Sequence, residues 1–161
     1  MKAGITGHQN LGDEETVAWV TESLLNAITQ HKVDYGFTSL AIGADQLFAQ
    51  ILRDRGIPYT TVLPCQKIEK TFQTPAHLEN YRRLLKNAAS VETLNFIEPA
   101  EIAFFEAGKR VIDLSEILVA VWNGLPAKGL GGTADAVKYA LDQKKSVVHI
   151  NPITKQVIEK G

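Results

Sequence analysis

The stretch between residues 116 and 140 constrains the fold most strongly, because three kinds of local sequence follow one another in it. Residues 117–122 form a continuous apolar run, which is typical of a strand buried on both faces of a sheet. Residues 124–133 contain four glycines and one proline, so they predict a loop. Val137, Ala140 and Leu141 then fall on one helical face. The stretch therefore predicts a strand, a glycine-rich loop and a helix.

This order of elements can aim backbone N–H groups at an anion where the helix begins. Gly131 and Gly132 permit close approach and positive φ, and Thr133 supplies a hydroxyl group for an N-cap. The same glycines also suit a tight turn in which they are needed for steric reasons alone. From the glycine cluster by itself, both interpretations stay open.

Apolar segments and amphipathic segments alternate along the rest of the chain. The predicted strands are residues 2–6, 40–42, 59–63, 91–96, 118–121 and 147–150, with the tail as an edge extension. Helices are predicted after Asp13, between Gly43 and Gly56, from Pro75 and from Pro99 to Val111, as well as after the glycine-rich loop. This alternation predicts one α/β domain over residues 1–161, with a mostly parallel sheet between two layers of helices.

Composition sets limits on the class of protein. A length of 161 residues fits one domain, and 45% hydrophobic content is ordinary for a globular chain. The net charge of −1 argues against a nucleic-acid partner. The single cysteine, Cys65, excludes an internal disulfide and suits a reducing cytoplasm. No apolar run is long enough to span a bilayer, so we expect a cytoplasmic protein without a membrane partner.

The residues at the strand ends are the candidates for function, since ligands of such sheets bind outside the carboxyl ends of the strands. Glycine occurs at three of the strand-to-helix passages, which favours a ligand crevice over three coincidental turns. The predicted ligand-binding residues are Thr6, Gly7, His8, Gly43, Ala44, Asp45, Arg82, Trp122, Asn123, Gly131, Gly132, Thr133 and Asp135.

Each of these side chains also has a purely structural interpretation. His8 is either a solvated loop histidine or a neutral imidazole that contacts a ligand. Asp45 either interacts with the helix dipole or accepts hydrogen bonds from a ribose. Trp122 is either a core aromatic or a stacking surface for a base. Arg82 is either a solvated helix charge or a fork for a phosphate group.

Five short motifs give the chain a family resemblance. They are Gly-Ile-Thr-Gly-His at residues 4–8, Gly-Ala-Asp-Gln-Leu-Phe-Ala at 43–49, Asn-Tyr-Arg-Arg-Leu-Leu at 80–85, Ala-Val-Trp-Asn-Gly at 120–124 and Gly-Gly-Thr-Ala-Asp at 131–135. On these motifs the chain resembles the SLOG superfamily to about residue 152. That group of Rossmann-like domains includes DNA-processing DprA proteins, Lonely-guy phosphoribohydrolases and nucleotide-signalling sensor domains. The resemblance implies a Rossmann-like fold and a nucleotide-related ligand.

One departure from the family pattern affects the expected activity. The hydrolytic Lonely-guy members place a glutamate three residues after the threonine of their glycine motif, and this chain has Ala136 there. Asp135 lies one residue earlier, and one residue turns a helical side chain by about 100°. A carboxylate that must sit beside an anomeric carbon does not tolerate such a shift. The chain therefore departs from the pattern that accompanies hydrolysis.

Two classes of function follow. The first is a binding or sensing module for a nucleotide or nucleotide derivative, with the glycine-rich loop on its phosphate. The second is an enzyme that cleaves an N-glycosidic bond with Asp45, Asp135 or Glu106 as its carboxylate. A DprA-like DNA-binding function fits poorly with the net charge of −1. No protein metal site is expected, although Mg²⁺ could enter through ligand phosphates.

The sequence also predicts a homo-oligomer, with a dimer as the simplest case. Two predicted helices carry more apolar side chains than one face of a sheet requires. These residues are Ile102, Phe104, Phe105, Tyr81 and Leu84.

Overall fold

The computed structural model describes residues 1–127 and 129–161. The strands are β1 (Lys2–Gly7), β2 (Tyr35–Thr38), β3 (Tyr59–Leu63), β4 (Ser90–Thr93), β5 (Ile117–Val121), β6 (Ser146–Asn151) and β7 (Gln156–Lys160). The α-helices are α1 (Glu14–Gln30), α2 (Ala44–Asp54), α3 (Pro75–Lys86), α4 (Glu101–Leu114) and α5 (Thr133–Asp142), with a short 3₁₀ helix at Ile68–Thr71.

All seven strands form one sheet in the order β4-β3-β2-β1-β5-β6-β7. Every pairing is parallel except that of β7, which runs antiparallel to β6. The chain builds one side of the sheet from β1 to β4 and then returns to place β5 on the other side of β1. The strand order therefore reverses at β1, where β2 and β5 flank it.

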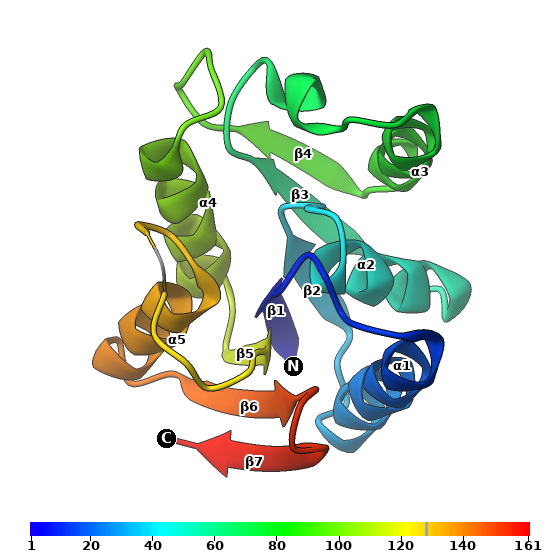
Figure 1. The fold of residues 1–161 in the computed structure, drawn as a ribbon, viewed down its shortest axis with the longest axis vertical. Helices are drawn as coiled ribbons and strands as arrows, with labels where there is room; N and C mark the ends of the chain where they lie inside the picture. Colours follow the sequence, from blue (N-terminus) through cyan, green and yellow to red (C-terminus); the bar gives the residue numbers. More distant parts are fainter. Residues whose placement is uncertain (128) are drawn as a thin grey trace.

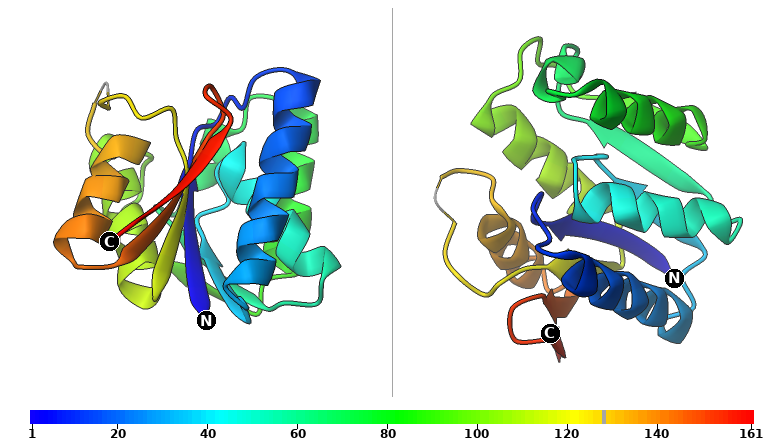
Figure 2. Two further views of the ribbon diagram at one scale, coloured as in Figure 1. Left: turned by 90° about the horizontal axis from the view of Figure 1, so that it is seen from below. Right: turned by 45° about the vertical axis from the view of Figure 1, so that its right-hand side comes forward.

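The helices cover both faces of this sheet and make three layers (Figure 1). Helices α1, α2 and α3 lie on one face, and α4 and α5 lie on the other, as the left view of Figure 2 shows edge-on. The largest apolar core lies beneath the first three helices and includes Leu24, Phe48 and Tyr81. This arrangement confirms the predicted α/β fold with a mostly parallel sheet and helices on both faces.

Local sequence explains where the best-predicted elements begin. All five residues of β5 are buried, as its continuous apolar run predicts. Asp13 caps α1 by accepting a hydrogen bond from the N–H of Thr16 at 2.8 Å. Thr74 caps α3 in the same way, and Pro75 occupies its first turn. The predicted edge extension is β7, which completes the sheet beside β6.

The second predicted strand is wrong. Residues 40–42 form a loop, and the strand is β2, four residues from Tyr35 to Thr38. Leu40 is fully buried but has a φ of +56°, which no strand residue adopts. Leu40 is therefore buried as part of a loop, whereas Ala41 and Ile42 are half-buried. The fourth strand is also shorter than predicted, because β4 ends at Thr93.

Two of the apolar residues that motivated the oligomer prediction are not on the surface. Tyr81 is 1% exposed and Leu84 is completely buried, so both belong to the core between α3 and the sheet. Ile102 and Phe104 on α4 are exposed, as expected. Within residues 1–127 and 129–161, the helices are all too short or too polar to cross a membrane.

Candidate functional site

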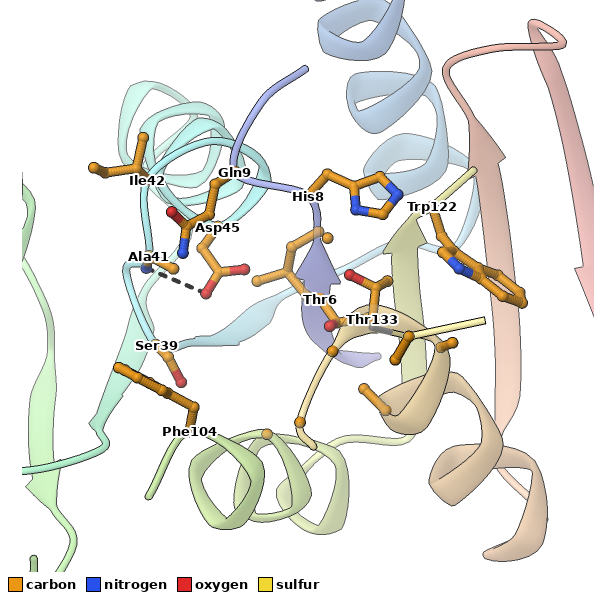
Figure 3. A pocket seen from close by; sticks show the side chains of 18 of the residues that line it. Thr6, His8, Gln9, Ser39, Ala41, Ile42, Asp45, Phe104, Trp122 and Thr133 are labelled. Carbon is orange, nitrogen blue, oxygen red and sulfur yellow. Dashed lines mark hydrogen bonds between the residues drawn. The ribbon is translucent and has the colours of Figure 1, made fainter. Parts of the chain in front are cut away.

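A cavity of about 910 Å³ opens at the carboxyl ends of β1, β2 and β5. Its walls are the loops that follow these strands, the side of α4 from Glu101 to Val111, the first turn of α5, part of the segment after β3, and residues 152–153 after β6. This is the point where the strand order reverses, and open α/β sheets bind their ligands at that point. Figure 3 shows the cavity with side chains from both halves of the chain around it.

The glycines at the first two strand ends allow two loops to pack against each other. A Cβ atom on Gly7 would collide with the side chain of Ala44, and one on Gly43 would collide with the backbone carbonyls of His8 and Gln9. The N–H of Ala44 donates to the carbonyl of His8 at 3.2 Å. Gly7 lines the cavity, whereas Gly43 and Ala44 lie behind its wall and hold it in place.

His8 is a neutral imidazole in this wall. The N–H of Asn123 donates to its Nε2 atom at 3.0 Å, which requires an unprotonated Nε2 and leaves the proton on Nδ1. Burial lowers the pKa of His8, against a smaller opposing contribution from the side chain of Asn123. His8 therefore links the loop after β1 to the loop after β5 and lines the cavity as a neutral group.

Asp45 is the buried carboxyl group of the cavity, only 7% exposed at the start of α2. Oδ2 accepts a hydrogen bond from the N–H of Ala41 at 3.3 Å, and the other oxygen points toward Thr6 and the cavity (Figure 3). Desolvation by burial raises the pKa of Asp45 to about 7, against smaller opposing contributions from the N–H groups of Ala41 and Ser39. A buried carboxyl group with a shifted pKa in a cavity is a typical feature of functional sites.

The glycine-rich loop lines the cavity with Gly131, Gly132 and Thr133, but its geometry differs from the prediction in two respects. Positive φ occurs at Gly131, at +84°, whereas Gly132 has a φ of −72°. Gly132 is the N-cap residue of α5 and Thr133 is its first helical residue, so the Thr133 hydroxyl group does not cap the helix. The prediction of a Thr133 cap is therefore wrong.

Asp135 supports the loop from within. Its Oδ2 atom accepts a hydrogen bond from the N–H of Gly131 at 3.0 Å. The side chain is bound to the loop backbone and is not part of the cavity wall. Asp135 was predicted to bind the ligand, and the structure instead places it against the backbone of the loop.

Trp122 and Asn123 follow β5 and line the cavity, as predicted. The indole N–H of Trp122 donates to the carbonyl of Leu125 at 2.9 Å, and its ring lies 4.9 Å from the ring of His149. The side-chain oxygen of Asn123 accepts from the N–H of Leu125 at 3.0 Å. Both residues therefore fix the start of the glycine-rich loop in addition to facing the cavity.

Two further predicted residues, Arg82 and Glu106, lie away from the cavity. The guanidinium group of Arg82 binds Glu69 through two hydrogen bonds of 3.1 and 2.6 Å on the surface beside α3. Glu106 forms an ion pair with Lys109 at 2.8 Å, and neither Arg82 nor Glu106 lines the cavity. A phosphate fork from Arg82 and a catalytic carboxylate from Glu106 have no geometric support.

Sequence reasoning missed several residues of the wall. Ser39, Leu40, Ala41 and Ile42 line the cavity, although residues 40–42 were assigned to a strand. Phe104 was assigned to an oligomer surface, but it also lines the cavity, and its side chain lies beside Ser39 in Figure 3. The sequence does not show that Phe104 reaches the cavity, because its position depends on how α4 packs beside α5.

The described part of the chain holds no group of three or more His, Cys, Asp or Glu side chains placed to bind a metal ion. Mg²⁺ carried by a ligand phosphate therefore stays a prediction.

Comparison with known proteins gives structural matches only. No protein-family model and no curated sequence matches the chain. DNA processing protein A from Helicobacter pylori, which binds single-stranded DNA, matches with a TM-score of 0.68 and 14% identity over 92% of this chain and 64% of that protein. Its counterpart from Streptococcus pneumoniae gives 0.66 and 14% over 92% of this chain and 49% of that protein. The chain thus spans less than two thirds of either protein.

A third match is a cofactor carrier protein and not a DNA-processing protein. The molybdenum cofactor carrier protein from Chlamydomonas reinhardtii matches with a TM-score of 0.57 and 19% identity over 92% of this chain and 74% of that protein. The chain shares a Rossmann-like fold with these proteins. This confirms the Rossmann-like fold that the sequence motifs imply, and the cavity lies at the carboxyl edge of its sheet.

Proposed function

We propose that the chain binds or senses a nucleotide or nucleotide-derived ligand in the cavity at the carboxyl ends of β1, β2 and β5. The observation that carries this proposal is Asp45, a carboxyl group that is 7% exposed and turns one oxygen toward the cavity. Burial of such a group is unfavourable unless a partner satisfies it. Paired ribose hydroxyl groups are donors of suitable geometry for this oxygen.

The other walls suit the rest of such a ligand. Phe104 of α4 and Trp122 after β5 line the cavity and offer aromatic surface to a base. Its volume of about 910 Å³ lies at the upper end of the range typical of small-molecule sites. Structural neighbours that bind molybdenum cofactor or single-stranded DNA support ligand binding by this fold in general.

The test is isothermal titration of the chain with nucleosides, nucleoside monophosphates, NAD derivatives and a single-stranded oligonucleotide. We expect a small ligand from this panel to bind, and Asp45→Asn to weaken it about tenfold or more through loss of a buried polar contact. Asp54→Asn at the exposed end of α2 is the matched control and should bind normally. Binding of the oligonucleotide alone, or equal binding by Asp45→Asn, would contradict the proposal.

A second candidate function is cleavage of an N-glycosidic bond, and the pKa of about 7 for Asp45 is the observation that favours it. A carboxyl group with this pKa can donate or accept a proton near neutral pH. Asp135 is bound to Gly131 and Glu106 to Lys109, so neither competes for this role. Chromatography of each ligand after incubation with the chain would detect a released base.

A further inference from the structure

The charged groups around the cavity bear on the part of a nucleotide that this site accepts. Among the described lining residues, the charged side chains are Asp45, Glu101 and Lys109. The ammonium group of Lys109 lies 2.8 Å from Glu106 and 4.9 Å from the ring centre of Phe105. Its charge is therefore already compensated by a carboxylate of its own helix. No other described cation faces the cavity, and His8 is neutral.

Two carboxylates also flank the glycine-rich loop, where a phosphate was predicted. Asp135 occupies the N–H of Gly131 at 3.0 Å, so one donor that an anion would use already has a partner. The carboxylate of Glu101 lies against the other side of the loop, because a Cβ atom on Gly129 would be 2.8 Å from its Oε1 atom. Both charges would repel a phosphate group at the start of α5.

Asp45 provides an independent indication of ligand chemistry. It is more than nine-tenths buried, and one of its oxygens points into the cavity. This oxygen can accept hydrogen bonds from hydroxyl or amino groups of a ligand. Asp45 thus favours a ligand with hydrogen-bond donors, and Glu101 and Asp135 favour one without negative charge.

We propose that the cavity takes a neutral ligand of the nucleoside class, and that Asp135 is a specificity residue which disfavours the phosphorylated form. This inference rests on the proposed function and refines it, because it replaces the predicted phosphate at the glycine-rich loop with an uncharged end of the ligand. Asp135 acts through charge at the loop and not through contact with the cavity.

The experiment compares each nucleoside with its own 5′-monophosphate by calorimetric titration, using adenosine and guanosine pairs. Asp135→Asn removes the charge and keeps an oxygen that can accept from Gly131, so the loop retains its support. Asp142→Asn at the other end of α5 makes the same change of charge and is the matched control. Asp135→Ala removes both charge and support, and its far-ultraviolet circular dichroism shows whether the loop contact is needed for folding.

We expect the unmodified chain to bind the nucleoside at least about tenfold more tightly than the monophosphate. Asp135→Asn should reduce this ratio several-fold by improving monophosphate binding, whereas Asp142→Asn should leave it unchanged. Added salt should also reduce the ratio, since it screens repulsion between charges near solvent.

The two proposals fail in different ways. If no small ligand of the full panel binds, the proposed function is wrong. If only an NAD derivative binds, the proposed function stands and the preference for a neutral ligand is wrong. If the monophosphate binds as tightly as the nucleoside or more so, the proposed function stands and the preference for a neutral ligand is wrong. An unchanged ratio in Asp135→Asn would exclude Asp135 as the specificity residue.

Lys128 belongs to the sequence of the loop but lies outside the described residues, so the experiment includes Lys128→Gln. We expect this variant to keep the ratio of the unmodified chain. Tight monophosphate binding that Lys128→Gln abolishes would show that the loop recognises phosphate through this lysine, and it would overturn the inference.

Discussion

Asp45 is a deeply buried titratable group, so its ionisation should affect the free energy of unfolding of the chain as well as ligand binding. Its pKa is about 7 in the folded chain and 3.8 in a solvated one. Between these values the folded chain holds a proton that the unfolded chain has lost. Stability should therefore fall as pH rises from 4 to 7, and change little through this group above that range.

We predict that the free energy of unfolding of the unmodified chain, measured relative to Asp45→Asn, decreases by an amount on the order of 4 kcal/mol between pH 4 and pH 8. Urea unfolding of both proteins at several pH values measures this difference, and the comparison cancels the titration of all other groups. Parallel profiles for the two proteins would show that the pKa of Asp45 is close to normal.

Residue-level prediction from the sequence succeeds where a residue follows its strand directly and fails where a distant partner decides. Thr6, His8 and Trp122 line the cavity because the carboxyl ends of parallel strands meet at one edge. Arg82 was assigned to the ligand because its sequence neighbourhood does not show Glu69, which binds it. Such pairings form only when the elements pack.

At the scale of elements, α2 is bounded by two glycines whose environments differ. Gly43 has a φ of +91° and backbone atoms of His8 and Gln9 at its Cβ position. Gly56 has a φ of +69° and no described atom within 4 Å of its Cβ position. The first glycine is needed for conformation and for close packing, and the second for conformation alone.

We predict that Gly56→Ala lowers the free energy of unfolding by about 1–2 kcal/mol through positive φ. Gly43→Ala should lower it by at least about 2 kcal/mol more, since backbone atoms have to move. Chemical denaturation of both variants measures the costs. If both variants lower the free energy of unfolding equally, the backbone of His8 and Gln9 moves at little energetic cost. The cavity wall that this loop forms could then change its shape.

The element-scale prediction is correct for the order of strands and helices and wrong for one strand. Periodicity identifies β5, where all five residues are buried. It fails for residues 40–42, because a buried loop at the edge of a cavity has the same apolar composition as a strand. The positive φ of Leu40 distinguishes them, and the sequence holds no sign of it.

At the scale of the whole molecule, the apolar surface of α4 motivates a prediction about assembly. Ile102 on α4 is 44% exposed and does not line the cavity, whereas Phe104 does. We predict a homodimer in which Ile102 is covered, and Ile102→Glu should give a monomer because it introduces charge there. Val91→Glu on β4, which is 49% exposed, is the control and should leave the mass unchanged.

Light scattering measures the mass of all three proteins. A monomer mass for the unmodified chain at high micromolar concentration would refute the dimer. A dimer that survives Ile102→Glu would place the interface on another surface.

The strand order also has a consequence for how the chain could be divided. Residues 94–100 join the part that builds β1 to β4 to the part that builds α4 to β7. Thr6 and Asp45 belong to the first part, whereas Trp122 and Thr133 belong to the second, so neither fragment alone would hold a complete cavity. Cutting the chain in this segment would turn ligand binding into a readout of fragment complementation, with the parallel pairing of β1 and β5 as the new intermolecular contact.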